Sequence, residues 1–465
     1  MVAVFHPGAR LAAEDEPAEL LVAHEDSQRG QERSATVTLS GAHRAQVSLP
    51  EEIADDPVVN KRLYKRQVKL ALYHALKTTT GMHPPWGSLT GIRPTRLIYE
   101  AMEEGLTLNQ ACSRMMGLFD VRPENAGLLA EVVSTQRALP PAAEDEVDIY
   151  IGVPFCPSRC RYCSFISMQV GKGDLLEPYT EALIGEIGQT VQVLKEQGMR
   201  PRAFYMGGGT PTALQPAQLE RVLAAAQPLM RAARERTVEA GRPDSITPEQ
   251  LRVIRDAGAE RISVNPQTSF DRTLQAIGRG HTRAQAEQAY ALARQMGFEV
   301  INMDLIAGLP GEDVAMFEQT LDWVSAMQPE NLTVHTLCVK RSSEMHRLQD
   351  SLPAGDQVAF MVQLGRAAAE GLGMKPYYLY RQKHMAGNQA NVGYAMPATA
   401  CLYNVDTMED DVSVLAMGAG AISKRVTKGR EMVYRAPNVK NVGEYIARAG
   451  EMAARKRALW DDQPQ

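Results

Sequence analysis

Three cysteines, Cys156, Cys160 and Cys163, lie in one short run with the spacing Cys-x3-Cys-x2-Cys. Cysteine thiolate is the usual ligand of iron–sulfur clusters, and three thiolates in one loop can hold three irons of a [4Fe–4S] cluster. The fourth iron then has no protein ligand from this motif. Because an open coordination position is typical of catalytic metal centres, the spacing predicts a cluster that binds a further molecule.

A zinc site and a set of incidental cysteines are the alternatives to a cluster. Zinc ligands usually come as two pairs separated by a longer stretch, whereas the other cysteines, Cys112, Cys338 and Cys401, occur singly. The spacing favours iron–sulfur over zinc and leaves both alternatives open. A disulfide framework is not expected in a 465-residue chain with six cysteines and no secretory segment.

The composition is that of an ordinary globular protein, with 44% hydrophobic and 23% charged residues. A net charge of −5 and a pI near 6.1 do not indicate nucleic acid or an anionic membrane as a partner. The N-terminus lacks the basic start and apolar core of a signal peptide. No stretch approaches the ~20 apolar residues of a membrane span. We therefore expect a cytoplasmic protein without stable membrane insertion.

The cysteine run follows the first of six short apolar stretches that alternate with helix-like periods. The predicted strands lie at 147–153, 203–206, 237–240, 261–265, 300–305 and 332–337. The predicted helices lie at 175–197, 217–231, 248–257, 284–296 and 314–327. Such alternation implies parallel strands joined by right-handed crossovers. Six repeats are fewer than the eight of a closed barrel, so the class is α/β and the pattern predicts a partial barrel.

Three domains are expected along the chain. Residues 1–140 form an N-terminal accessory domain with weak strand signals at 35–39 and 45–49 and a helix-like run at 56–78. Residues 147–345 form the partial barrel. Residues 346–465 form a C-terminal domain with helical runs and a glycine-rich stretch at 417–423, which we expect to cover the substrate.

In barrels of parallel strands, the chemistry lies at the C-terminal strand ends. Here these ends carry the cysteines, then the run Gly-Gly-Gly-Thr-Pro-Thr at 207–212, and then Glu239, Asn265, Gln267 and Asp304. Glycines let the backbone approach a ligand closely. Taken singly, the glycines could form a simple turn and the carboxylates could cap helices. Their joint placement predicts one ligand site around the cluster.

These motifs together resemble the radical S-adenosylmethionine (SAM) enzymes. More narrowly, the segments 150–163, 207–212, 263–267, 277–282 and 304–310 resemble the oxygen-independent coproporphyrinogen III oxidase family. Segments 85–94, 377–383 and 391–394 are similar to its HemZ-type coproporphyrinogen dehydrogenase branch, so the resemblance spans most of residues 80–425. It implies a partial (β/α)6 radical SAM barrel with an N-terminal α+β domain and a C-terminal, mostly helical extension.

The resemblance also implies a [4Fe–4S] cluster and SAM as cofactors, with SAM chelating the open iron. It places Tyr162 near the adenine and the backbone of Gly208, Gly209 and Thr210 at the methionyl end. Further SAM contacts are implied for a set of residues on the strand ends: Tyr150, Glu239, Gln267, Arg279 and Asp304. The Arg279 guanidinium suits a carboxylate through paired hydrogen bonds. No residue is assigned as the catalytic acid or base.

The implied reaction converts two propionate chains of coproporphyrinogen III to vinyl groups, giving protoporphyrinogen IX for haem biosynthesis. A SAM-derived radical removes hydrogen from the propionate β-carbon, after which CO2 and an electron leave. The implied partners are this tetrapyrrole and a reducing electron donor such as flavodoxin or ferredoxin. Arg341, Arg381 and Lys383 are candidate contacts for the substrate carboxylates, although solvated surface cations would look the same.

Two positions depart from the oxidases of this family. Phe165 stands where they carry a fourth cysteine, and Gly152 stands where a histidine is common. Haem chaperones of the same superfamily also lack the fourth cysteine. One alternative function is therefore a haem-binding transfer protein that retains the cluster, and another is a radical SAM enzyme that acts on a different tetrapyrrole. The candidate haem ligands of a transfer protein would be His281, His335, His346, His384 and Cys338.

Overall fold

The computed structural model describes residues 1–6, 9–13, 16–91, 93–163, 168–171, 175–340, 343–345, 352–383, 385–427 and 432–461. Phe165, Arg341, His346 and His384 lie outside these ranges. The chain forms two compact units, one of residues 1–131 with 381–389 and one of residues 132–380 with 390–465. The second unit carries the predicted site.

The first unit contains an antiparallel sheet and a long helix. The sheet has the order β1(Leu20–Arg29), β2(Glu32–Gly41), β3(Ala45–Glu52). Helix α2(Pro57–Thr80) begins at the Asp56 carboxylate, which accepts hydrogen bonds from two backbone amides, and it ends at Gly81 in the left-handed conformation. The predicted strands and helix lie within β2, β3 and α2. β1 was missed because nearly all of its residues are exposed, so it lacks an apolar alternation.

The remaining helices before the barrel are α1(Val2–Phe5), α3(Pro94–Glu103), α4(Leu108–Phe119) and α5(Pro123–Arg137). The core of the first unit forms where α2 packs on the sheet, around Val37, Leu39, Tyr73 and Leu76.

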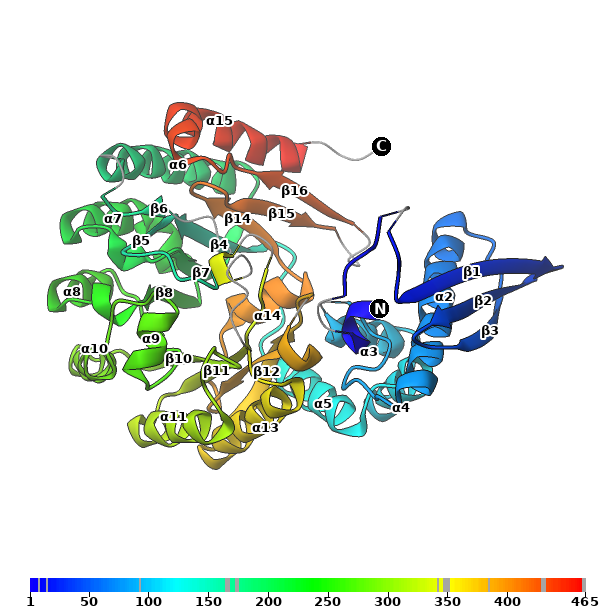
Figure 1. Cartoon of the computed structure of the whole chain (residues 1–465). Coiled ribbons are helices and arrows are strands. Elements are labelled where there is room, and N and C mark those ends of the chain that lie inside the picture. The colour runs from blue at the N-terminus through cyan, green and yellow to red at the C-terminus, as the bar shows by residue number, and fades with distance from the viewer. Residues whose placement is uncertain are drawn as a thin grey trace. The chain divides into compact units, whose positions relative to one another are not determined.

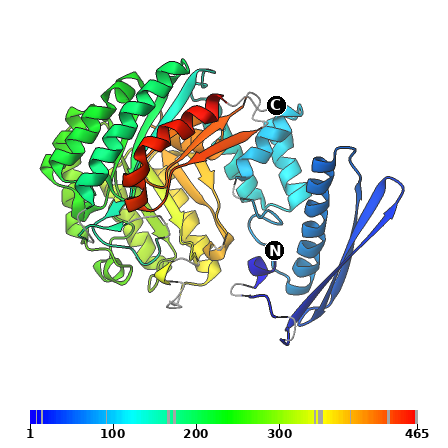
Figure 2. The same cartoon turned by 90° about the horizontal axis from the view of Figure 1, so that it is seen from above.

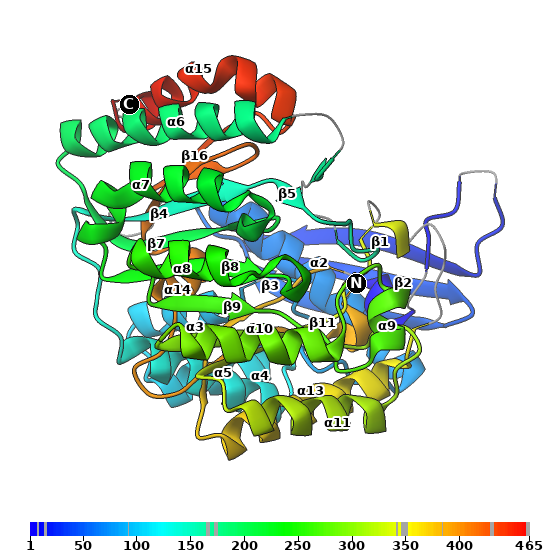
Figure 3. The same ribbon diagram turned by 90° about the vertical axis from the view of Figure 1, so that its left-hand side faces the viewer.

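The second unit is built on an eleven-stranded sheet whose central strands confirm the predicted alternation. Six neighbouring parallel strands are β4(Glu146–Val153), β7(Arg200–Gly208), β8(Glu235–Gly241), β9(Arg261–Val264), β10(Val300–Ala307) and β11(Asn331–Thr336). The connecting helices are α6(Leu176–Glu196), α7(Pro216–Ala232), α8(Pro248–Asp256), α9(Asp271–Ala276), α10(Arg283–Gln295) and α11(Val314–Met327). The long helices lie side by side along one face of the sheet (Figures 1 and 3).

The C-terminal region was predicted as a mostly helical extension, and this prediction is wrong in one respect. Besides α13(Gly355–Gly371), α14(Leu402–Glu409) and α15(Val442–Asp461), it contributes strands to both edges of the large sheet. These strands are β12(Lys375–Tyr380), β13(Asn391–Ala395), β14(Ser413–Met417), β15(Ile422–Val426) and β16(Val433–Pro437). They are short, and the strands that join them to the central sheet, β13 and β14, pair with β11 and β4, which lie far away in sequence, so local pattern alone did not reveal them.

β14 pairs in parallel with β4, which places the C-terminal glycine-rich stretch beside the start of the barrel. α15 then lies against α6 (Figure 2). Among the described residues, no helix has the length and apolar character needed to cross a membrane.

Candidate functional site

The cysteine loop begins where β4 ends. Cys156 lies in the short strand β5(Phe155–Cys156), which pairs with β6(Met168–Gln169) and so closes the loop at its base. The amide of Cys163 donates to the carbonyl of Cys160 at 3.1 Å. Cys160 is buried, whereas Cys156 and Cys163 are half-buried. The loop therefore presents two partly accessible thiols around a buried one.

The glycine run at the end of β7 approaches this loop closely. The Gly209 amide donates to the Val153 carbonyl at 2.7 Å. A side chain at Gly209 would place its Cβ 2.5 Å from the Phe155 carbonyl oxygen and 3.0 Å from the Cys156 sulfur. The Thr210 hydroxyl lies 3.5 Å from the same sulfur. Glycine is required at 209 because any side chain would collide with the cysteine loop.

Two acidic side chains face the interior of the barrel at the next strand ends. The Tyr205 hydroxyl donates to Glu239. Burial, with the nearby Asp304 carboxylate, raises the pKa of Glu239 to about 7 despite this hydrogen bond. Burial also opposes ionisation of Asp304, but hydrogen bonds from His335 and Asn302 hold its pKa below the usual value. At neutral pH this site therefore has one ionised carboxylate and one near its titration point.

Gln267 and Arg279 lie in the loops that follow β9. Gln267 has a left-handed backbone (φ 71°), and its amide and carbonyl both pair with β10, so the strand pairing stabilises this uncommon conformation. Arg279 is buried and donates to the Asn265 carbonyl at 2.5 Å. Buried polar atoms of all three lack a partner among the described residues: Asn265 Oδ1, Gln267 Oε1 and Arg279 Nε. Such unpaired groups fit a site for a polar ligand.

The two predicted tyrosines occupy different sides of the site. Tyr162 packs against the apolar cluster around Leu274 and Ile277 and faces Cys160 and Arg279; burial raises its pKa. Tyr150 lies in the barrel interior, where its hydroxyl would be 3.3 Å from a Cβ at Gly208. A Cβ at Gly152 would meet the Tyr150 ring at 3.1 Å, so the absent histidine leaves room for this ring.

The sequence prediction missed Tyr205 and Tyr403, which stack with Tyr150. The rings of Tyr205 and Tyr403 are 4.4 Å apart, and those of Tyr150 and Tyr403 are 5.9 Å apart. A signal existed for Tyr205, because Tyr150 and Tyr205 are paired residues of neighbouring strands and must point to the same face. Tyr403 comes from α14, and no local signal could have placed it there. The sequence prediction also missed Arg242, which follows β8 and lies 3.7 Å from the Cys160 sulfur.

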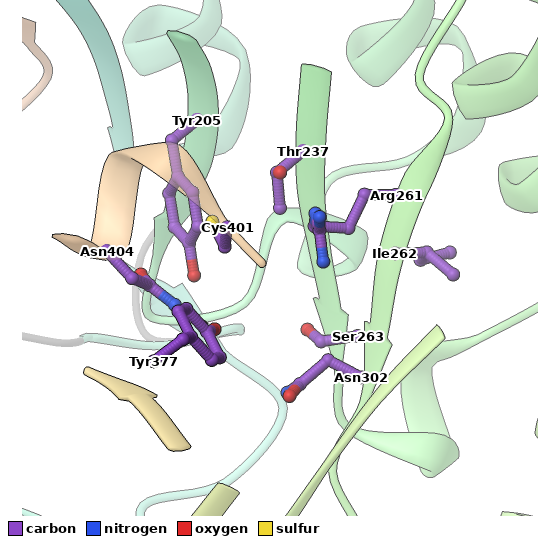
Figure 4. A pocket seen from close by; sticks show the side chains of 9 residues that line it. All are labelled: Tyr205, Thr237, Arg261, Ile262, Ser263, Asn302, Tyr377, Cys401 and Asn404. Carbon is purple, nitrogen blue, oxygen red and sulfur yellow. The ribbon is translucent and has the colours of Figure 1, made fainter. Parts of the chain in front are cut away.

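Tyr205 also lines a small cavity of about 20 Å³, together with residues of β8, β9, β10, β12 and α14 (Figure 4). Three of its lining residues carry buried polar atoms without a partner among the described residues: Thr237 Oγ1, Arg261 Nε and Ser263 Oγ. A polar cavity of this size holds about one water molecule. It is far too small for a tetrapyrrole.

Of the three candidate substrate cations, Arg341 lies outside the described residues, and Arg381 and Lys383 belong to the first unit. Arg381 belongs to the first unit and is buried there, where it donates to the Leu89 carbonyl at 2.8 Å. The Arg381 guanidinium is therefore already hydrogen-bonded within the first unit. Lys383 is an exposed residue of the same unit.

Two of the candidate haem ligands have partners within the protein. His281 is buried against the Pro266 carbonyl, and His335 pairs with Asp304 at 3.5 Å.

The donor set fits a cluster with a bound cosubstrate. Within the described ranges, no three side chains of Cys, His, Asp or Glu converge on a single-ion position. A [4Fe–4S] cluster does not require this, because each thiolate binds a different iron. The three thiols, the glycine cradle beside Cys156, and the unpaired polar atoms at 265, 267 and 279 suit a cluster and a zwitterionic ligand.

The chain has relatives among known proteins. It matches the radical SAM superfamily over residues 150–324. It is 37% identical over 393 residues to the oxygen-independent coproporphyrinogen-III oxidase-like protein HemZ of Bacillus subtilis, covering 83% of this chain and 78% of that protein. It is 29% identical over 235 residues to the heme chaperone HemW of B. subtilis, covering 49% of this chain and 61% of that protein.

Among solved structures, the fold is similar to that of coproporphyrinogen III oxidase (HemN) from Escherichia coli, a radical SAM enzyme. The TM-score is 0.53 at 23% sequence identity, covering 67% of this chain and 70% of that chain. This likeness shows a shared fold.

Proposed function

The chain belongs to the HemZ-like oxygen-independent coproporphyrinogen III oxidase family of radical SAM proteins, and on that basis we propose that it oxidatively decarboxylates coproporphyrinogen III to protoporphyrinogen IX. Membership of the superfamily implies a [4Fe–4S] cluster and SAM. When bound, these cofactors supply a carbon-centred radical that abstracts hydrogen from an unactivated carbon. We propose that the protein works in the cytoplasm with a low-potential donor such as flavodoxin or ferredoxin.

In this proposal, residues at different strand ends bind the cluster and different parts of SAM. Cys156, Cys160 and Cys163 hold the cluster, and the backbone at 208–210 binds the methionyl end of SAM. The Glu239 carboxylate accepts hydrogen bonds from hydroxyl or amino groups, for which its ionised form is the stronger acceptor. The Arg279 guanidinium, whose Nε has no partner among the described residues, binds the ligand carboxylate, and the unpaired Gln267 Oε1 accepts a hydrogen bond from a ligand amino or hydroxyl group.

The remaining proposed contacts orient the cofactor. Contacts with His335 and Asn302 fix the orientation of the Asp304 carboxylate. Tyr150 stacks with Tyr403 and forms an aromatic wall beside the glycine run. Tyr162 covers the cluster loop on the side of Cys160.

The similarity to HemZ carries the substrate assignment, because it extends over 393 residues and hence well beyond the radical SAM segment. The decisive experiment incubates the anaerobically reconstituted chain with coproporphyrinogen III, SAM and dithionite. Mass spectrometry should detect the divinyl product together with 5′-deoxyadenosine. Stoichiometric haem binding without any vinyl product would instead favour the transfer function named for HemW.

A cysteine variant tests the cofactor assignment separately. The reconstituted chain should bind about four irons, and Cys160→Ala should lose both the cluster absorption and SAM cleavage. Cys112→Ala is the matched control, because Cys112 is a buried cysteine of α4 in the first unit and should retain both. SAM cleavage that survives in Cys160→Ala would contradict the assignment.

A further inference from the structure

A buried arginine, Arg242, lies at the end of β8 and reaches into the cysteine loop. It follows Gly241 and precedes a short 3-10 turn, and its side chain is only 3% exposed. An arginine is seldom buried unless it is paired. Here every nitrogen of the guanidinium has a partner, and these partners come from two different segments.

One side of the guanidinium binds a carboxylate. Arg242 Nε and Nη2 donate to the two oxygens of Asp244 at 3.0 Å and 2.6 Å, which is a paired, charge-assisted geometry. Asp244 is half-buried and lies two residues further along the chain. The pair therefore fixes the plane of the guanidinium.

The other side faces the cysteine loop. Nη1 donates to the Ser158 carbonyl at 2.8 Å and to the Ser158 hydroxyl at 2.9 Å, and it lies 3.7 Å from the Cys160 sulfur. The Ser158 hydroxyl in turn donates to the Gly278 carbonyl at 3.0 Å. Arg242 thus joins the end of β8 to the loop that holds the cluster ligands.

Two glycines make room for this junction. A Cβ at Gly278 would lie 3.1 Å from the Arg159 carbonyl oxygen, and its φ of +77° suits glycine. A Cβ at Gly280 would lie 3.0 Å from an Asp244 carboxylate oxygen. The loop at 278–280 can therefore close against both the cysteine loop and the Arg242–Asp244 pair.

We propose that Arg242 is a positioning residue that holds the Cys160 segment and raises the reduction potential of the cluster, and that Asp244 opposes this effect. Hydrogen bonds to cluster sulfurs and nearby charge set such potentials. Reduction adds one negative charge to the cluster, so a cation beside a thiolate stabilises the reduced form. An anion beside that cation reduces this stabilisation. The inference rests on cluster binding and not on the identity of the tetrapyrrole.

The test is an anaerobic redox titration of the reconstituted full chain, followed by electron paramagnetic resonance without SAM or substrate. Arg242→Gln removes the charge and should shift the midpoint potential to more negative values. Asp244→Asn keeps the shape but removes the opposing charge, so it should shift the midpoint to more positive values. Arg255→Gln, an exposed arginine in the last turn of α8, is the control and should leave the midpoint unchanged.

Opposite shifts in the two variants support the proposal, because mere distortion of the loop has no reason to give opposite signs. Unchanged midpoints in both variants, or shifts in the same direction, overturn it. If Arg242→Gln does not retain iron, Asp244→Asn decides alone, and a midpoint that is unchanged or more negative overturns the proposal. An inactive but normally titrating wild-type protein would contradict the proposed substrate and leave this inference intact.

Discussion

At the scale of single residues, Glu239 is a proposed SAM contact in an environment that disfavours its charged form. Its pKa of about 7, against 4.5 for an ordinary glutamate, reflects burial and the neighbouring Asp304. The protonated side chain is therefore favoured by folding, and this contribution is lost as the pH rises through 7. If Glu239 binds the ligand as proposed, its ionised carboxylate has a stability cost in the free protein.

Replacing Glu239 with glutamine should remove this cost. We expect Glu239→Gln to gain about 1–3 kcal/mol of unfolding free energy at pH 8, with the gain growing between pH 4.5 and 7, while SAM affinity falls. Urea unfolding at pH 5 and pH 8 measures the gain, and equilibrium dialysis measures SAM binding. Glu220→Gln, on an exposed position of α7, should change neither quantity. A stability change independent of pH would contradict the assigned cause.

At the scale of elements, the C-terminal helix supports the strand that carries the cysteine loop. Glu186 of α6 is fully buried and accepts hydrogen bonds from the Gly418 amide and Asn438, as well as from Tyr445 and Lys456 of α15. Gly418 in turn lies against the Gly152 carbonyl, which also accepts from the Tyr179 hydroxyl at 2.6 Å. α6, α15 and the end of β4 therefore form one interconnected polar core.

The ion pair of this core gives a second prediction. Lys456→Met leaves the Glu186 carboxylate buried without its cation, and breaking such a pair costs about 3–5 kcal/mol. The denaturant midpoint should fall accordingly, and iron retention should fall with it. Arg457→Ala removes an exposed ion pair with Glu196 from the same helix and should leave the midpoint unchanged. A wild-type midpoint in Lys456→Met would show that the pair adds no stability.

At the scale of the whole molecule, the first unit is completed by residues far along the chain. Residues 381–389 belong to it, although the strand before them, β12, belongs to the second unit. Arg381 lies over the buried Trp86 ring at 5.1 Å and donates to Leu89 and Asn388. Its burial lowers its pKa to about 10, so it stays charged at neutral pH.

We therefore expect Arg381→Ala to loosen the first unit. The variant removes several charge-assisted hydrogen bonds, each worth about 1.5–3 kcal/mol, and should increase amide hydrogen exchange in peptides covering 84–91. Peptides from the central strands β8 and β9 should exchange as in the wild type. Arg96→Ala, which removes only an i,i+4 surface pair in α3, serves as the control. Unchanged protection at 84–91 would refute the role of this segment.

Local pattern was sufficient for the barrel repeats and insufficient for what surrounds them. The six central strands and five of the helices between them were predicted within a few residues, because each repeat buries an apolar run of recognisable period. The edge strands β12 to β16 escaped prediction, since they are short and are anchored to the central sheet by the distant pairings of β14 with β4 and β13 with β11.

The sequence by itself determined which residues stand at the strand ends: the cysteine spacing, the glycine run and the order of the polar residues after each strand. These features are local, and parallel strands necessarily bring their C-terminal ends to one edge. Only the tertiary structure decided which further groups lie beside these residues. Tyr205 beside Glu239, Tyr403 beside Tyr150 and Arg242 beside Cys160 are long-range contacts. Burial and charge act through space, so their effects follow from the fold and not from spacing along the chain.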